Sequence, residues 1–302
     1  MAYCYRMLGS VQDAEDLVQE TMLRAWRARD RYDSTRASLR TWLYRIATNA
    51  CLTALEGRAR RPLPSGLGPP NEDISTPLTP AFEVPWLQPF PDARYDTGIR
   101  ADMRLALVAA MQVLPPRQRA VLVLREVLEF SAAEVATQLA ITVPAVNSAL
   151  QRARAAVADL NDERDVAEPD DPEVRTVIDH YMQAFEAADV PNLVKLLTDD
   201  AVLEMPPAPL WYRGRRDYGL FMDRVFEMRG PGWRVRPLTA NGQPAVAAYA
   251  PDQGDGHRLH SLQVFTVTGG QVCYNVVFAD PRAFEAFKLP ERIPVDEFRQ
   301  SR

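Results

Sequence analysis

Apolar and polar residues follow their most regular helical spacing between Ser131 and Arg154, where we expect two short helices with a tight turn between them. Ser131 and Glu134 form a capping box, which satisfies free amides where the first helix begins. Pro144 fits the first turn of the second helix, because no backbone hydrogen bond is lost there. The expected buried stripe of the second helix consists of Val146, Leu150, Ala153 and Val157. This pattern is typical of a helix-turn-helix, and it also fits a plain helical hairpin in a protein core.

The opposite face of the second helix carries side chains suited to DNA. Its polar residues are Asn147, Ser148, Gln151, Arg152 and Arg154, and Pro144 lies at the helix start. Short polar side chains can hydrogen-bond base edges in the major groove, and guanidiniums can bind the phosphates beside them. This face is therefore a candidate DNA-recognition surface.

The N-terminal segment predicts two longer helices, of which the first runs from Asp13 to Arg29. Its expected buried residues are Leu17, Val18, Met22, Ala25 and Trp26. Acidic side chains gather where this helix begins, namely Asp13, Glu15, Asp16 and Glu20. The positive end of the helix dipole favours negative charge there, so a solvated, well-capped helix start accounts for these acids on its own.

The second long helix begins at about Ser38, a candidate cap, and continues towards residue 60. Its expected buried stripe is Leu39, Leu43, Ile46, Ala47, Ala50 and Leu55. Its other face carries Arg40, Trp42, Tyr44, Arg45 and Asn49, and the helix ends in Arg58, Arg60 and Arg61. Aromatic rings can stack on unpaired bases while neighbouring arginines bind phosphate. Aromatic residues on a helix more often belong to a core, but their placement among arginines favours a nucleic-acid-binding face here.

Two composition breaks divide the chain. Residues 62–91 hold nine of the 25 prolines, which excludes a continuous helix and predicts an extended, partly stiff linker. Residues 161–171 are mostly acidic and are followed by Pro172. The net charge is −5, yet the first 61 residues are rich in arginine and could lie on phosphate, whereas the acidic break would be repelled from it.

The pattern changes after Pro172. An amphipathic helix, Val174 to Ala188, and a short second helix come first. Strands are expected at 201–205, 233–237, 245–250, 260–267 and 272–278, with Gly269 and Gly270 in the turn between the last two. Helices that precede a curved antiparallel sheet predict an α+β cone.

The composition is that of an ordinary globular protein. The chain has 302 residues, 47% apolar and 25% charged, and this length favours two or three domains. No apolar run is long enough to cross a membrane, and the N-terminus lacks the features of a signal peptide. The three cysteines are far apart, as is typical of buried thiols in a reducing compartment and not of a zinc site. We therefore expect a cytoplasmic protein without a metal or a cofactor.

Three segments of the chain resemble bacterial sigma factors of the extracytoplasmic-function (ECF) group. They are DAEDLVQETMLRAW, SLRTWLYRIATNACLTAL and LPPRQRAVLVLREVLEFSAAEVATQLAITVPAVNSALQRARAAV, in the order and at the separations expected of that family. The resemblance spans Met1 to about Leu160. It implies two all-α sigma domains, a promoter-opening domain (1–61) and a helix-turn-helix domain (100–160), joined by a linker (62–99). The PWLQPF segment in that linker and the C-terminal extension are similar to the subgroup with a fused SnoaL-like domain.

The resemblance also implies partners and roles. Glu15, Asp16 and Glu20 would bind the clamp helices of the largest subunit of core RNA polymerase. The segment from Asp33 to Asn49 would open the minus-ten element of promoter DNA with Arg40, Trp42, Tyr44, Arg45 and Asn49. Arg58, Arg60 and Arg61 would follow the adjacent backbone, and the helix Pro144 to Arg154 would enter the major groove of the minus-thirty-five element. Binding energy would drive the opening, because the capture of flipped bases repays the cost of unstacking.

The chain departs from the family pattern at its start. AYCYRMLGS is normally preceded by further helical residues, so we expect the domain 1–61 to be N-terminally short. A misplaced start codon or a shortened paralogue would account for this, and we favour a misplaced start codon.

The string YMQAFEAADVPNLVKLLTDDAVLEMPP resembles SnoaL-like members of the NTF2-like superfamily. This implies an α+β cone over residues 172–290, between an acidic linker (161–171) and a tail (291–302). Cones of this kind usually enclose a pocket, and the candidate lining residues are Tyr181, Glu204, Trp211, Tyr249, His260 and Asn275. Catalytic relatives use an acid or a His–Asp pair inside the cone. Asn275 stands where such an acid would serve, and an amide cannot exchange protons, so we expect a regulatory module with no catalytic residue and a small ligand as its candidate partner.

The leading hypothesis is a sigma factor whose activity is modulated by its own SnoaL-like domain in place of a separate anti-sigma factor. One alternative is a helix-turn-helix regulator that binds DNA without core polymerase, which would need neither the acidic helix nor the opening segment. The other is a SnoaL-like enzyme with a DNA-binding segment, for which His260 is the plausible imidazole. A strand histidine bonded to a neighbour is the simpler interpretation of His260.

Overall fold

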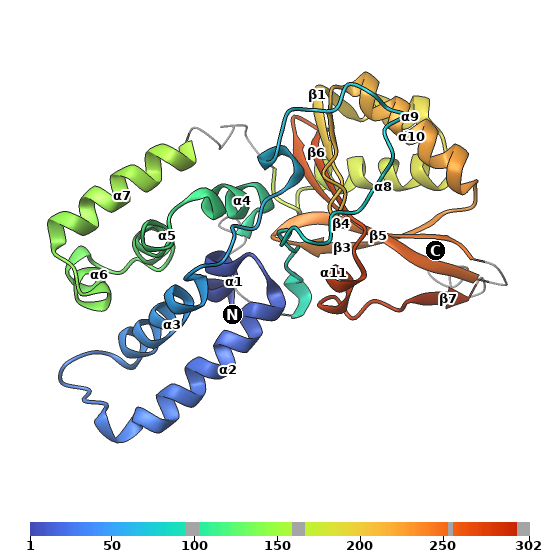
Figure 1. Cartoon of the computed structure of the whole chain (residues 1–302). Coiled ribbons are helices and arrows are strands. Elements are labelled where there is room, and N and C mark those ends of the chain that lie inside the picture. The colour runs from blue at the N-terminus through green and yellow to red at the C-terminus, as the bar shows by residue number, and fades with distance from the viewer. Residues whose placement is uncertain (95–102, 159–166, 253–255, 295–302) are drawn as a thin grey trace. The chain divides into compact units, whose positions relative to one another are not determined.

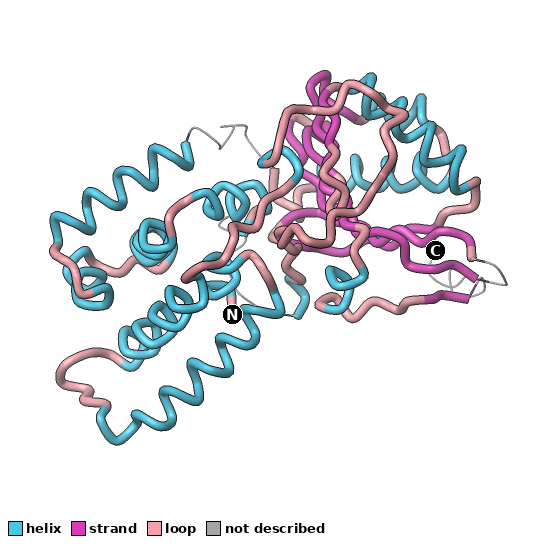
Figure 2. Tube along the Cα trace, viewed as in Figure 1, coloured by secondary structure: helices cyan, strands magenta, loops and turns pink. Residues whose placement is uncertain are grey.

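The structure, a computed structural model, describes residues 1–94, 103–158, 167–252 and 256–294 and forms two compact units. One unit contains Met1–Pro62 and Thr97–Glu163, and the other contains Leu63–Asp96 and Arg164–Arg302. The described part of the first unit consists of helices and loops, whereas every described strand belongs to the second (Figure 1, Figure 2). The expected all-α segments followed by an α+β domain are confirmed.

Serine side chains cap three helices of the first unit. Its helices are α1 (Ala2–Leu8), α2 (Val11–Ala28), η1 (Arg29–Arg31), α3 (Leu39–Leu55), α4 (Leu105–Val113), α5 (Pro116–Leu122), η5 (Val123–Val127), α6 (Ala132–Leu139) and α7 (Val143–Ala158). Ser10, Ser38 and Ser131 cap α2, α3 and α6, and each hydroxyl accepts a bond from the amide three residues further on. Gly9 ends α1 with a φ of 67°, a left-handed turn that favours glycine.

The outer face of α2 differs from the sequence prediction. Met22 (56% exposed) and Trp26 (67% exposed) lie at the surface, not in the core, and Leu39 at the start of α3 is 53% exposed. The residues that α2 does bury are Val11, Ala14, Thr21 and Ala25. These small side chains let α2 approach its neighbours closely. Helical spacing alone did not show which of two adjacent apolar stripes faces the core.

The second unit is a curved sheet with helices packed on it. Its elements are η2 (Pro64–Gly66), η3 (Asp92–Arg94), α8 (Pro172–Glu186), α9 (Val190–Lys195), β1 (Leu197–Glu204), β2 (Trp211–Arg213), α10 (Arg215–Arg229), β3 (Arg234–Ala240), β4 (Gln243–Pro251), β5 (Gly256–Thr268), β6 (Gln271–Phe278), α11 (Pro281–Glu285) and β7 (Arg292–Pro294). The strand order is β2-β1-β6-β5-β4-β3, and β7 pairs with β5. β1 and β6 are parallel, and the other pairs are antiparallel. The main core lies between the sheet and helices α8, α9 and α10.

All five predicted strands overlap observed ones, but β2, α10, α11 and β7 were not predicted. The turn at Gly269 and Gly270 joins β5 to β6 as expected, with positive φ at both glycines. Helix α10 contains Gly219, where an added Cβ would lie 2.8 Å from a methyl carbon of Val194 in α9. The two helices approach so closely that only glycine fits at position 219. Glycine disfavours helix, so Gly219 weakens the helical pattern of α10 in the sequence.

The proline-rich segment 63–94, which we call the linker segment, is extended as predicted but packs on the second unit (Figure 1). The Trp211 indole donates to the carbonyl of Gly68 at 2.9 Å, and the amide of Ala81 donates to the carbonyl of Pro207 at 2.9 Å. At its far end the amide of Phe90 donates to the Asn241 side chain at 2.7 Å. The linker segment is therefore part of the surface of the C-terminal domain and not a free connector.

Candidate nucleic-acid interface

Helix α7 presents one polar face to solvent above an apolar stripe. The buried stripe consists, as its spacing predicted, of Val146, Leu150, Ala153 and Val157. The residues predicted to contact DNA are exposed without exception: Pro144, Asn147, Ser148, Gln151, Arg152 and Arg154. The capping box of Ser131 and Glu134 holds the start of α6, and Ala140, with a φ of 53°, makes the tight turn before α7. The arrangement is a helix-turn-helix with its second helix open on one side.

Arg154 differs from its neighbours on α7 because it has an ion-pair partner. Its Nη2 lies 2.8 Å from Oε1 of Glu126, and the two side chains are 60% and 39% exposed. An ion pair so exposed contributes little, so a phosphate can replace Glu126 at low cost.

The predicted promoter-opening face lies along α3 and varies in exposure. Arg40, Arg45 and Asn49 are exposed, whereas Trp42 and Tyr44 are half-buried. The Trp42 ring packs against Tyr32 with centroids 5.0 Å apart, and the Tyr44 ring packs edge to face against Tyr3 at 5.4 Å. The neighbours of the two rings therefore fix their orientation, while the polar residues between them face outward.

The start of α3 is in contact with the turn before α6. Nη2 of Arg40 donates to the carbonyl of Leu128 at 2.6 Å, and its guanidinium lies 4.3 Å from the centroid of the Phe130 ring. Tyr44 packs edge to face against the same Phe130 ring at 5.6 Å. Two of the predicted opening side chains are therefore in contact with the helix-turn-helix part of the unit in this structure.

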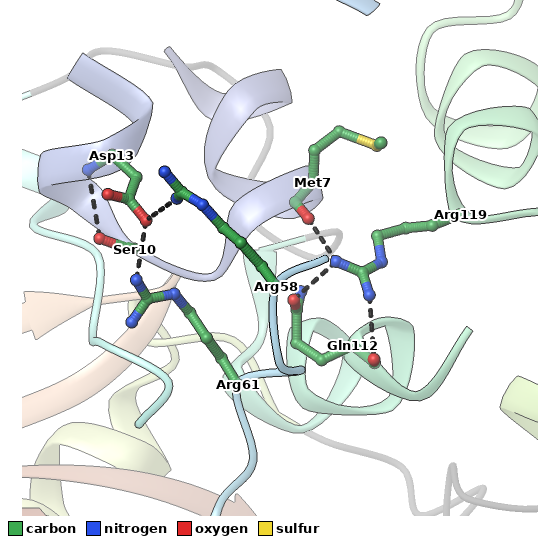
Figure 3. A network of polar contacts seen from close by, with 7 residues as sticks. All are labelled: Met7, Ser10, Asp13, Arg58, Arg61, Gln112 and Arg119. Carbon is green, nitrogen blue, oxygen red and sulfur yellow. Dashed lines mark hydrogen bonds and ion pairs between the residues drawn. The ribbon is translucent and has the colours of Figure 1, made fainter. Parts of the chain in front are cut away.

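A buried arginine makes a second contact between these two parts of the unit (Figure 3). Arg119 in α5 donates to the carbonyl of Met7 at the end of α1 and to Oε1 of Gln112 at 2.7 Å. Nε2 of Gln112 donates in turn to the carbonyl of Arg6 at 3.1 Å. Burial lowers the pKa of Arg119 to about 10, so the guanidinium is charged at neutral pH. The positive charge suits the carbonyl-rich end of α1.

The arginines at the end of α3 gather around one carboxylate (Figure 3). Oδ2 of Asp13 accepts a bond from Nη1 of Arg58 at 3.1 Å and from Nη2 of Arg61 at 2.7 Å. Arg60 between them is exposed. Two of the three predicted backbone-binding arginines, Arg58 and Arg61, thus lie beside the first turn of α2.

Helix α2 exposes both acidic and apolar side chains. Asp16 is exposed, and Glu15 and Glu20 are half-buried, with Glu20 paired to Arg24 at 2.6 Å. Further along the helix are the exposed apolar residues Met22, Leu23 and Trp26, which we call the α2 patch. Exposed large apolar side chains gathered on one helix indicate a protein-binding surface. The sequence analysis missed this surface because it assigned Met22 and Trp26 to the core.

The interior of the C-terminal domain is filled by a buried hydrogen-bonded cluster. Its members are Tyr181, Tyr218, Gln263 and Asn275. The two tyrosine hydroxyls lie 2.9 Å apart, and Nδ2 of Asn275 donates to Tyr218 at 2.7 Å and to Oε1 of Gln263 at 3.1 Å. These groups bind one another, and none of them is a carboxylate or an imidazole that could exchange a proton at neutral pH.

Glu204 lies in β1 and binds the linker segment. Its carboxylate accepts a bond from the backbone amide of Ser65 at 3.0 Å and another from the hydroxyl of Tyr274. Burial raises the pKa of Glu204, and the bonds from Tyr274 and Ser65 oppose that rise. The residue predicted to line a pocket therefore serves as an acceptor for the linker segment.

The other predicted pocket residues lie apart from one another. Trp211 donates to the linker segment, and Tyr249 belongs to a separate small core with Leu259 and Ile293. His260 packs edge to face against Trp233 at 5.0 Å, and burial lowers the pKa of its imidazole to about 4. The imidazole is therefore neutral at neutral pH. Of the six candidates, Tyr181 and Asn275 are hydrogen-bonded at 3.3 Å, and Glu204 and Trp211 are paired across β1 and β2.

A cavity of about 690 Å³ lies elsewhere in the C-terminal domain, and none of the six candidates lines it. Its walls include Pro91 of the linker segment, Val174 and Ile178 of α8, Leu238 of β3 and Ala245 of β4. These five side chains are apolar, but Arg94, Asp170, Arg175 and Asp179 also line the cavity, so it suits a largely apolar molecule that also carries polar groups.

Family models match all three parts of the chain. Sigma-70 region 2 matches residues 1–61, Sigma-70 region 4 matches residues 104–157, and a SnoaL-like domain matches residues 178–275. The ECF RNA polymerase sigma factor SigG of Mycobacterium tuberculosis is 46% identical over 303 residues, which cover 97% of this chain and 81% of SigG. The chain belongs to the ECF RNA polymerase sigma factors. This sigma factor therefore binds core RNA polymerase and promoter DNA and directs the polymerase to initiate transcription.

A second relative matches the sigma factor over nearly its whole length. The ECF RNA polymerase sigma factor SigJ of Mycobacterium tuberculosis is 29% identical over 309 residues, which cover 97% of this chain and 92% of SigJ. A crystal structure of SigJ matches the sigma factor with a TM-score of 0.68, at 25% identity and over 96% of both chains. No helix in the described part of the sigma factor is long and apolar enough to cross a membrane.

Sequence reasoning did not reveal the contacts that involve Phe130, Glu204 and Asp13. The sequence does place an aromatic residue directly before the α6 cap and an acid within a strand, but it does not show what either residue touches. Asp13 was interpreted only as an acid at a helix start. The two residues that donate to Asp13, Arg58 and Arg61, follow it in the chain by 45 and 48 positions.

Proposed function

We propose that α7 enters the major groove of the minus-thirty-five element. The supporting observation is that its buried stripe turns the six predicted DNA-contacting residues outward on one face. Asn147, Ser148 and Gln151 are short enough to bond base edges from a helix in the groove, and Arg152 and Arg154 flank them to bind phosphates.

We assign the opening of the minus-ten element to α3 and to the arginines that follow it. The residues in this assignment are Arg40, Trp42, Tyr44, Arg45, Asn49, Arg58, Arg60 and Arg61. Arg45 and Asn49 are exposed, so they can meet a displaced strand directly. Arg40 and Tyr44 become available once Phe130 moves away from them.

The surface that binds core polymerase is assigned to α2. Glu15, Asp16 and Glu20 supply negative charge for the clamp helices of the largest subunit, and the α2 patch supplies apolar area beside them. Apolar side chains at the centre of an interface with charges at its rim are the usual composition of protein interfaces.

We further propose that the SnoaL-like domain modulates the sigma factor through the linker segment. The linker segment connects the promoter-opening part to the helix-turn-helix part, and it is bound along its length by the C-terminal domain. The two DNA-binding parts must separate along promoter DNA, so a domain that holds the connecting segment can limit that separation. The interior cluster without an acid–base pair supports a non-catalytic role, and the largely apolar cavity is the candidate ligand site. Because core polymerase is the partner, we place this activity in the cytoplasm.

Run-off transcription with core polymerase tests these assignments. The full sigma factor and a form truncated after Leu160 are compared on the same promoter, and we expect their initiation rates to differ severalfold. Equal rates would contradict modulation by the SnoaL-like domain. Promoter binding without any initiated transcript would instead contradict the assignments on α3 and α2.

A further inference from the structure

One carboxylate lies between two arginines that are assigned to the DNA backbone. The Asp13 side chain is 26% exposed, and its Oδ2 atom binds both Arg58 and Arg61, whose side chains are 51% and 20% exposed. The group carries two positive charges and one negative charge, so it keeps a net positive charge at the end of α3 (Figure 3).

The position of Asp13 is fixed by local structure. Its amide donates to the hydroxyl of Ser10, the residue that caps α2, at 3.2 Å. The carboxylate therefore projects from a defined first turn, whereas Arg58 and Arg61 follow the end of α3 in a segment without regular structure. Long arginine side chains lose much rotamer freedom on binding, unless a partner already orders them.

A guanidinium can bind a carboxylate and a phosphate at the same time. It has five N–H donors, and each bond to Asp13 occupies one of them. Donors on the other nitrogens of Arg58, whose side chain is 51% exposed, can then reach a phosphate.

We propose that Asp13 is a positioning residue for promoter DNA, which holds Arg58 and Arg61 side by side so that they meet the DNA backbone as an ordered pair. The proposal rests on the assignment of these two arginines to the backbone beside the minus-ten element. The proposal predicts that removal of the Asp13 carboxylate weakens DNA binding. A carboxylate near DNA repels phosphate, so its removal should strengthen binding, unless its ordering of the arginines contributes more than its charge costs.

Promoter binding by the reconstituted holoenzyme tests this claim. The probe is a labelled promoter duplex, followed by fluorescence anisotropy at several salt concentrations. Asp13→Asn should weaken binding about two- to fivefold, the range expected for an exposed ion pair. It should also reduce the slope of log K against log salt by up to about one phosphate contact. The matched control is Glu56→Gln, which removes the same charge two residues before Arg58. Glu56 is exposed and has no ion pair in the described part of the chain, so its variant should bind as tightly as the unchanged protein or slightly more tightly.

A double-mutant cycle shows whether Asp13 acts through the arginines. Arg58→Ala with Arg61→Ala should weaken binding and reduce the salt slope by up to about two contacts. Adding Asp13→Asn to that pair should not weaken binding further, and at most it should strengthen binding slightly, as Glu56→Gln does, because only the charge of Asp13 is then removed. Asp13→Glu keeps the charge and should retain most of the affinity.

Three outcomes would decide against a role for the group. If Asp13→Asn binds as tightly as Glu56→Gln or more tightly, Asp13 only opposes DNA. If it lowers the thermal unfolding midpoint and the affinity but leaves the salt slope unchanged, Asp13 is only a structural tie. If the two alanine substitutions leave binding unchanged, the assignment of Arg58 and Arg61 fails, whatever Asp13→Asn does.

Discussion

Replacement of Glu204 by alanine should release the start of the linker segment from the C-terminal domain. The Glu204 side chain is fully buried, and it accepts the amide of Ser65 at 3.0 Å. Alanine offers no acceptor, so Ser65 must turn to water. Because the other bonds of the linker segment, such as those to Trp211 and Asn241, do not depend on Glu204, the release should be local.

The size of the effect follows from the kind of bond that is lost. Leaving one partner of a buried hydrogen bond without its acceptor costs about 1–3 kcal/mol, and each 1.4 kcal/mol corresponds to about a tenfold change in an equilibrium constant. Amide hydrogen exchange at Ser65 should therefore become roughly 10- to 100-fold faster. The amide of Asn71 donates to the carbonyl of Trp211 at 2.8 Å and serves as an internal control, which should exchange at its usual rate.

Glu204→Gln is the matched variant, because its amide oxygen can still accept the bond from Ser65. It should leave exchange at Ser65 within about tenfold of the unchanged protein. Since burial raises the pKa of Glu204, the folded state binds this proton more tightly than the unfolded state does. The stabilisation from the protonated group is present at acidic pH and is lost as the pH rises through the raised pKa. Glu204→Gln should thus gain stability relative to the unchanged protein as the pH rises. Unchanged exchange at Ser65 in the alanine variant would refute the role of Glu204 as its acceptor.

Three further outcomes are expected. Asn147→Ala with Gln151→Ala should lower run-off transcription at least tenfold without moving the thermal unfolding midpoint, since each good base contact contributes about 1–3 kcal/mol and both side chains are exposed. A promoter with a scrambled minus-thirty-five element should abolish the difference. Trp26→Ala should weaken binding to core polymerase by about 1 kcal/mol or more while the isolated chain stays folded, because this side chain is 67% exposed, and unchanged affinity would exclude it from the interface. Burial lowers the pKa of His260 to about 4, so its neutral form stabilises the fold above pH 6.5. This contribution, up to about 3 kcal/mol, is lost as the pH falls towards 4. Denaturant unfolding should therefore show that the stability difference between the unchanged protein and His260→Gln shrinks over that range.

Elements with strong local signals were predictable from the sequence. The buried stripe of α7 repeats at helical spacing, and the turn between β5 and β6 needs positive φ at Gly269 and Gly270, so both follow from residues close in the chain. The capping box of Ser131 and Glu134 is local in the same way. Each of these features is decided within a few residues, and pattern reasoning is strongest there.

Features that depend on distant partners were not predictable. The proline content of the linker segment indicates its extended conformation but not the surface that it covers. Met22 and Trp26 have the spacing of core residues, yet smaller neighbours on α2 make the close contacts. The pocket candidates in the cone were chosen by residue type, whereas their surroundings depend on which side chains fill the interior. Asn275 and Tyr181 are held by Tyr218 and Gln263, and this contact set cannot be read from any one segment.

The two DNA-binding faces differ in how readily the free sigma factor presents them. The face of α7 is exposed, whereas Arg40 is bonded to the carbonyl of Leu128 and stacked on Phe130. A charged hydrogen bond contributes about 1.5–3 kcal/mol, and an exposed cation–π contact adds about 0.5–1 kcal/mol. A difference of that size keeps Arg40 bonded to Leu128 and Phe130 in most free molecules, since about 2.7 kcal/mol already gives a ratio near 99 to 1. It is small beside the binding free energy of a nanomolar complex, about 12 kcal/mol. Polymerase and promoter binding can therefore release Arg40 from these contacts, so that strand opening by α3 follows a rearrangement that recognition by α7 does not need.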